Sequence, residues 1–244
     1  MLHYVREGQG QPLVLVHGFL GGQHVFQDVV DALKERYDVI RVELPGHGES
    51  AVEKDAYSVY DYADAVIDVL KAEGITEVNW LGHSLGGYIT LAALETKRFP
   101  IKKAILAYSS ASPDDDAAIE KRTKQAKAIQ ENGVKQFVDE VIAAFFAEDA
   151  SPEAIDKGRQ EGYRATEQGL VVALEAMKAR PDQREFIETL DVPTLVLEGA
   201  FDGAVKPIQT NNAVIQKVVT QTGHLGMLED PQGFINAVIE FLDE

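Results

Sequence analysis

The sequence predicts an α/β fold: a mainly parallel β-sheet with helices on both faces and a helical insertion. The first observation is that apolar, β-branched runs alternate with amphipathic stretches, which is typical of parallel strands buried on both faces. The second is that one long stretch of helix formers interrupts this alternation. The runs expected as strands are residues 13–16, 39–42, 78–81, 104–108, 194–197 and 214–219, with residues 2–6 as an antiparallel edge strand.

Helix-period stretches lie between most of these runs. Those outside the insertion are residues 26–37, 59–73, 88–94 and 233–242. The insertion is rich in Ala, Glu, Lys and Gln and contains four expected helices, at residues 114–131, 134–147, 152–166 and 168–179. The expected organisation is a core of residues 1–112 and 181–244 with a helical cap of residues 113–180. Because ligands of open α/β sheets bind beyond the carboxyl ends of the strands, this cap should cover a pocket.

Composition restricts the partners of this chain. It has 244 residues, 45% of them hydrophobic and 26% charged, which is ordinary for a soluble globular protein. A net charge of −17 disfavours nucleic acid and anionic membranes as partners. There are no cysteines, no apolar run long enough to span a membrane, and no signal-peptide pattern at residues 1–7. We therefore expect a cytoplasmic protein that acts on a small molecule, and the oligomeric state stays open.

The third observation, which points to function, is the segment Gly82-His83-Ser84-Leu85-Gly86-Gly87 between an expected strand and an expected helix. A serine at such a sharp strand-to-helix turn forms a nucleophile elbow, which lifts the hydroxyl above the sheet edge. The chain crowds around this turn, so the positions two before and two after Ser84 must be small, and both are glycine. The turn also directs the backbone N–H of Leu85 toward a bound carbonyl oxygen.

A nucleophilic serine needs a base and an acid, and both candidates follow later strands. His224 lies in a loop after the last apolar run, and Asp202 lies just past the run at 194–197. The order Ser84, Asp202, His224 is the order that the elbow architecture uses. Glu198 and the acidic run at 114–116 compete with Asp202 for the role of the acid.

The second donor of an oxyanion hole is expected after the first long strand, where His17-Gly18-Phe19 stands. Gly18 permits close backbone approach, so the N–H of Phe19 should pair with that of Leu85. We expect His17 to be a structural hydrogen-bonding residue, and we place His17, Gly18 and His83 at the substrate pocket. We expect no metal and no cofactor, because the histidines are dispersed and no phosphate-loop or dinucleotide motif is present.

These motifs, together with residues 45–50 and Gly199-Ala200-Phe201-Asp202, resemble the α/β-hydrolase superfamily over nearly the whole chain. Residues 177–182, leading to 192–195, look like the small capped bacterial carboxylesterases. The resemblance implies an α/β-hydrolase fold with Ser84 as nucleophile, His224 as base and Asp202 as acid. Epoxide hydrolases and haloalkane dehalogenases of this superfamily carry aspartate at the elbow, so the serine disfavours those reactions.

The leading functional hypothesis is a serine hydrolase that cleaves small carboxylic esters through an acyl-enzyme. Two alternatives stay open. In the first, the same triad serves C–C bond hydrolysis, enol-lactone hydrolysis or a lyase step, with Arg122, Arg159, Arg164 or Arg180 binding a substrate carboxylate. In the second, the protein is a ligand-sensing binding protein that retains a triad.

Overall fold

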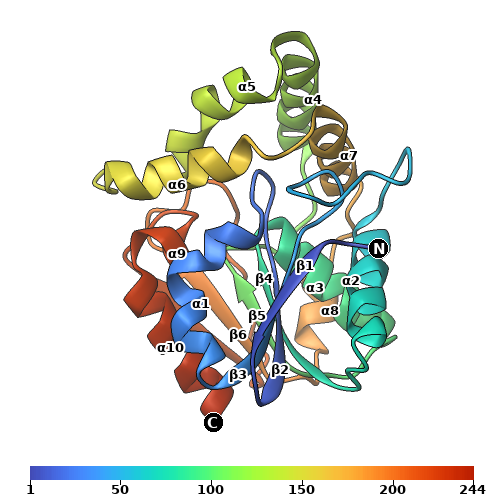
Figure 1. The fold of residues 1–244 in the computed structure, drawn as a ribbon, viewed down its shortest axis with the longest axis vertical. Helices are drawn as coiled ribbons and strands as arrows, with labels where there is room; N and C mark the ends of the chain where they lie inside the picture. The colour runs from blue at the N-terminus through green and yellow to red at the C-terminus, as the bar shows by residue number, and fades with distance from the viewer.

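Seven strands form one sheet in the computed structural model, which describes residues 1–244 (Figure 1). Their order across the sheet is β1-β3-β2-β4-β5-β6-β7. All neighbouring strands are parallel except β1, which pairs antiparallel with β3. The strands are β1 (Tyr4–Gly8), β2 (Gln11–Val16), β3 (Tyr37–Val42), β4 (Val78–His83), β5 (Ile101–Ala107), β6 (Thr194–Gly199) and β7 (Ile215–Thr220).

The predicted fold class is confirmed, and each expected strand is present. The expected edge strand begins two residues later than predicted and reaches Gly8, because its pairing with β3 extends from Tyr4 opposite Val42 to Gly8 opposite Asp38. β3 and β4 are buried along their whole length, and in β2 the side chains of Leu13–Val16 have no exposed surface. Burial on both faces explains why these strands read as unbroken apolar runs.

Helices cover both faces of the sheet (Figure 1). On one face lie α1 (Gln27–Lys34), α9 (Gly226–Glu229) and α10 (Pro231–Asp243), and on the other lie α2 (Val59–Ala72), α3 (Leu85–Thr96) and α8 (Arg184–Glu188). Local sequence fixes the start of α2, where Ser58 and Asp61 form a reciprocal capping box. The helix expected at residues 26–37 is shorter, because a 3₁₀ turn (η1, Gln23–Phe26) precedes it and Tyr37 already belongs to β3.

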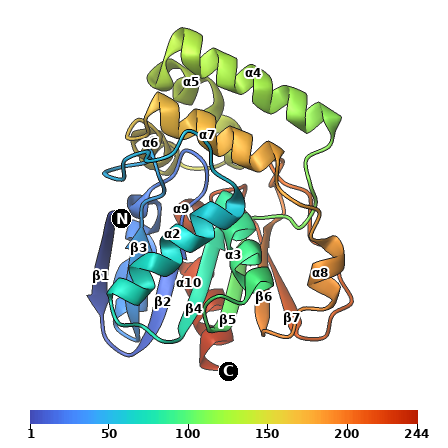
Figure 2. The ribbon, with the colours of Figure 1, turned by 90° about the vertical axis from the view of Figure 1, so that its right-hand side faces the viewer.

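Four helices and a 3₁₀ turn between β5 and α8 form a layer above the sheet, here called the insertion helices (Figure 2). They are α4 (Asp116–Asn132), α5 (Val134–Val141), η2 (Ile142–Phe145), α6 (Pro152–Gly162) and α7 (Glu167–Lys178). Side-chain caps from Asp115, Ser151 and Thr166 begin three of them. The single helix expected at 134–147 is divided, because the chain tightens into η2 and becomes extended at Phe146.

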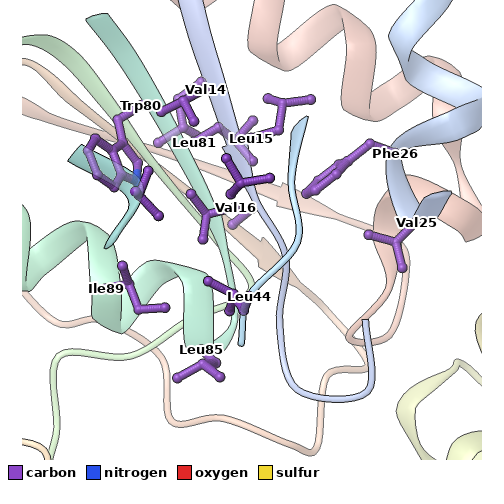
Figure 3. Packing of buried hydrophobic residues seen from close by; sticks show 14 of the residues in the cluster. Val14, Leu15, Val16, Val25, Phe26, Leu44, Trp80, Leu81, Leu85 and Ile89 are labelled. Atoms are coloured by element: carbon purple, nitrogen blue, oxygen red, sulfur yellow. The ribbon is translucent and has the colours of Figure 1, made fainter. Parts of the chain in front are cut away.

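The core is built around β2, β4 and α3. Val16 of β2, Trp80 of β4 and residues Leu85 and Ile89 of α3 belong to one buried cluster, which Figure 3 shows between the strands and this helix. Burying each such side chain contributes roughly 1.5–3 kcal/mol to folding. This packing fixes the end of β4 relative to α3, and with it the turn that carries Ser84.

Among the helices, none combines the length and apolar character that crossing a membrane requires.

Candidate active site

Ser84 occupies a strained turn between β4 and α3. Its φ of 52° lies in the left-handed region, where non-glycine residues are rare and cost about 1–3 kcal/mol. The surrounding chain enforces this turn: a Cβ on Gly82 would lie 2.1 Å from the Gly86 carbonyl oxygen, and one on Gly86 would lie 2.2 Å from that of Val16. The Ser84 carbonyl accepts hydrogen bonds from the Gly87 N–H and from Ser109 Oγ, both at 2.8 Å. The backbone of Ser84 is therefore fixed at this turn before any ligand arrives.

The structure brings Ser84, His224 and Asp202 together. His224 Nε2 lies 2.8 Å from Ser84 Oγ, and His224 Nδ1 lies 2.8 Å from Asp202 Oδ2. Since a carboxylate only accepts, the Nδ1–H of His224 donates to Asp202, which leaves Nε2 free to accept the serine proton. The side chains of His224 and Asp202 are 7% and 5% exposed, so this hydrogen-bonded series is shielded from water. The arrangement can remove a proton from Ser84 Oγ and return it later.

The competing acids are engaged elsewhere. Glu198 Oε1 accepts from the Ile208 N–H at 2.9 Å and pairs with Lys217. Asp114 forms ion pairs with arginines. Asp202 is itself fixed, because its Oδ1 accepts from the Ala204 N–H at 2.8 Å. Of these carboxylates, only Asp202 contacts His224.

The backbone N–H groups of Phe19 and Leu85 lie near Ser84 and donate to no protein acceptor. Leu85 is the first residue of α3, where the helix leaves its N–H groups unpaired. The loop that carries Phe19 lies against the elbow, because a Cβ on Gly18 would come within 2.9 Å of Ser84 Cβ. The two residues expected to form an oxyanion hole therefore flank the serine with free donors.

His17, Gly18 and His83 do not line the cavity that contains Ser84, contrary to the placement expected from sequence. His17 is fully buried and acts structurally: Nε2 accepts from the Leu44 N–H at 2.9 Å, and Nδ1 donates to the Gly18 carbonyl. Burial lowers the pKa of His17 well below its ordinary value, so the ring is neutral. His83 Nε2 donates to the His224 carbonyl at 2.8 Å, which holds the backbone of the histidine loop from behind.

The cavity beside Ser84 has a volume of about 310 Å³, at the small end for ligand sites. It lies between the carboxyl ends of the strands and the insertion helices α4 and α7. Its apolar wall includes Phe19, Tyr88, Phe145 and Met177. A cavity of this size suits a small acyl or alcohol group.

Sequence reasoning missed several residues that shape this site. The Glu229 carboxylate accepts from the N–H groups of Gly223 and Ala147, which ties the histidine loop to the insertion. The Phe145 carbonyl accepts from the His224 N–H at 2.7 Å, and the Phe145 ring lies 5.5 Å from the His224 ring. No local motif marks these residues, because each acts on a partner that is distant in sequence.

One other group could in principle hold a metal ion: His24, Glu43 and Glu161, whose ligand atoms lie within 4.8 Å of one another. The position of a cation is already taken by Arg164, which pairs with Glu161 at 3.1 Å and with Glu43 at 3.3 Å. Burial raises the pKa of Glu161. None of these residues lines the Ser84 cavity. We therefore interpret this cluster as an ion-pair network between α6 and the core.

A mainly parallel sheet with a serine elbow at its carboxyl edge defines the class of α/β hydrolases. The chain belongs to the family described as alpha/beta hydrolase fold, whose model matches residues 11–231.

Similar proteins include esterases. The pimeloyl-[acyl-carrier protein] methyl ester esterase of Vibrio cholerae is 28% identical over 98% of this chain and 97% of its own length. An uncharacterized hydrolase of Bacillus subtilis is 38% identical, but the match spans 44% of this chain and only 40% of that relative. A thermophilic esterase of Thermogutta terrifontis, solved with malate bound, matches with a TM-score of 0.90 and 29% identity, over 99% of this chain and 93% of the other. These names support the prediction of an ester-cleaving hydrolase.

Proposed function

We propose that this protein hydrolyses small carboxylic esters through a Ser84–His224–Asp202 triad. The observation that carries the proposal is the continuous hydrogen-bonded series from Asp202 through His224 to Ser84 Oγ, with the serine open to a cavity. The esterases among its relatives support the reaction class. We further propose that the insertion helices act as a cap, since α4 and α7 close the cavity from above.

In the proposed mechanism, His224 Nε2 takes the proton of Ser84 as Oγ attacks the ester carbonyl carbon. The N–H groups of Phe19 and Leu85 bind the oxyanion that forms, and each such donor is typically worth ~10²–10³ in rate. Collapse of the tetrahedral intermediate breaks the C–O bond, and His224 gives its proton to the leaving alcohol. A water molecule, deprotonated by His224, then attacks the acyl carbon. Collapse of this second intermediate breaks the bond to Ser84 Oγ, which takes the proton back from His224 as the acid leaves. Asp202 stabilises the imidazolium in both steps.

Labelling with a fluorophosphonate probe and peptide mass spectrometry test this proposal directly. We expect a single adduct on Ser84, absent in His224→Ala, and loss of p-nitrophenyl butyrate hydrolysis in Ser84→Ala. Ser112→Ala is the matched control, because Ser112 lines the same cavity outside the triad. Equal hydrolysis by wild type and Ser84→Ala would overturn the assignment, and fast multiple turnover would exclude a ligand-sensing role.

A further inference from the structure

Positive charge gathers in the cavity that contains Ser84, although the whole chain carries a net charge of −17. The cationic side chains that line it are Arg122, Arg180, Lys121 and Lys206, and the carboxylates are Asp114 and Asp115. Four cations against two carboxylates leave an excess of two positive charges. A cationic cavity in an acidic protein attracts anions, and the low dielectric of its walls strengthens that attraction.

Arg180 is fixed in position by contacts on several sides. Its Nε donates to the Ser112 carbonyl at 3.1 Å, and its Nη1 donates to the Met177 carbonyl and to Asp114. The guanidinium also lies over the ring of Tyr88, 4.3 Å from the ring centroid. Tyr88 belongs to α3, one turn after Ser84, so these contacts tie Arg180 to the helix that carries the serine.

Arg122, a second arginine in the cavity wall, lies next to Arg180. Its Nε and Nη2 donate to Asp114, the same carboxylate that Arg180 contacts. Asp114 is almost fully buried, with 3% of its side chain exposed. One carboxylate between two guanidinium groups holds them together but neutralises only one of their charges.

Each of these arginines keeps N–H groups for a ligand. Arg180 Nη2 and Arg122 Nη1 donate to no protein acceptor. Both nitrogens are accessible, because neither is one of the buried polar atoms that lack a hydrogen-bond partner. Both side chains line the Ser84 cavity. Free guanidinium N–H groups on preorganised arginines are suited to bind a carboxylate.

We propose that the substrate carries a carboxylate in addition to the scissile ester, and that Arg122 and Arg180 bind this group. The substrate class is then a monoester of a short dicarboxylic acid. This inference rests on the proposed ester hydrolysis at Ser84, and it adds what that proposal leaves open, namely which esters the site selects.

The test compares two methyl esters of the same length, monomethyl glutarate and its neutral amide, methyl glutaramate, with hydrolysis followed by proton release in a pH-stat. We expect wild type to favour the anionic ester at least about tenfold in kcat/KM, the range of a hydrogen-bonded ionic contact. In Arg122→Gln and in Arg180→Gln this ratio should fall at least about fivefold. Arg159→Gln is the matched control: this arginine lies on α6, pairs with Asp139 and Asp156, and does not line the cavity, so its ratio should equal that of wild type.

Arg180 is nearly buried and holds Asp114, so the more exposed Arg122 carries the test should Arg180→Gln fail to fold. Calorimetric titration of wild type and Arg122→Gln with glutarate, against glutaramide, gives a readout that needs no turnover. Wild type should bind glutarate more tightly, and the variant should lose that preference.

A wild-type kcat/KM ratio of one or less between the anionic and the neutral ester, or a ratio unchanged in the arginine variants, would overturn the inference while leaving ester hydrolysis intact. If neither ester is cleaved and Ser84 takes no label, the proposed function fails, and the glutarate titration still decides the anion site.

Discussion

We predict that lowering the pH from 7.5 to 5 removes about 4 kcal/mol of stability through two buried histidines, His47 and His83. Burial lowers the pKa of His47 to about 4. Burial, and to a smaller extent the nearby His224, lowers the pKa of His83 to about 3. Both rings are almost inaccessible to water, and each retains a nitrogen without a hydrogen-bond partner. The folded protein therefore holds both rings neutral at pH values where free histidine is protonated.

The sign follows from which state binds the proton first. In the unfolded chain both histidines have a pKa near 6.5, so on acidification the unfolded state is protonated while the folded state is not. The stability associated with neutral His47 and His83 is complete above pH 6.5 and is lost as the pH falls toward 4 for His47 and 3 for His83. At pH 5 each histidine accounts for a loss of about 2 kcal/mol.

Urea denaturation at pH 7.5 and pH 5, for wild type and His47→Gln, measures this loss. Glutamine does not titrate, so the variant should lose about 2 kcal/mol less than wild type between the two pH values. Other titrations cancel in this comparison, including that of buried Glu161, whose raised pKa acts in the opposite direction, and that of Asp61, whose pKa of about 2 lies below the range. An identical pH-dependent loss in the two proteins would refute the reasoning.

Three further substitutions test the site and the core. Asp202→Asn should lower kcat for p-nitrophenyl butyrate by about 10³–10⁴, because His224 would lose the partner that sets its tautomer, and an unchanged kcat would remove Asp202 from the mechanism. Gly86→Ala should cost more than about 3 kcal/mol in urea denaturation, since its Cβ would lie 2.2 Å from the Val16 carbonyl oxygen, whereas a near-neutral effect would show that the elbow can relax. Leu15→Ala should cost about 2–5 kcal/mol by the same measurement, and a loss below about 1 kcal/mol would mean that the core closes around the cavity.

The strands and the elbow could be predicted because their sequence signals are local. A strand buried on both faces must be apolar throughout, as Leu13–Val16 shows, and a tight strand-to-helix turn needs glycine at Gly82 and Gly86 whatever lies elsewhere. The expected order of the three triad residues follows from the same architecture, since each follows a parallel strand whose carboxyl end meets the same sheet edge.

The pocket could not be predicted in this way. His17 and His83 stand beside the elbow in sequence or space, yet both rings are buried. Backbone groups occupy both nitrogens of His17 and Nε2 of His83. Arg122 and Arg180 are among four arginines that the sequence offers for binding a carboxylate, and only the fold shows that these two meet at Asp114 and line the cavity. A charged residue on an amphipathic helix has the same sequence signature whether it faces water or a ligand, so periodicity cannot separate the two cases.

The contacts of the histidine loop link the insertion helices to the proposed chemistry. The His224 N–H donates to the Phe145 carbonyl, and Glu229 accepts N–H groups from both Gly223 and Ala147, so the end of η2 and the loop share one hydrogen-bond network. A hydrogen bond of 2.8 Å to Ser84 tolerates little displacement of the imidazole. It follows that the insertion supports the position of His224, so we expect its removal to disturb the hydrogen bond between His224 and Ser84.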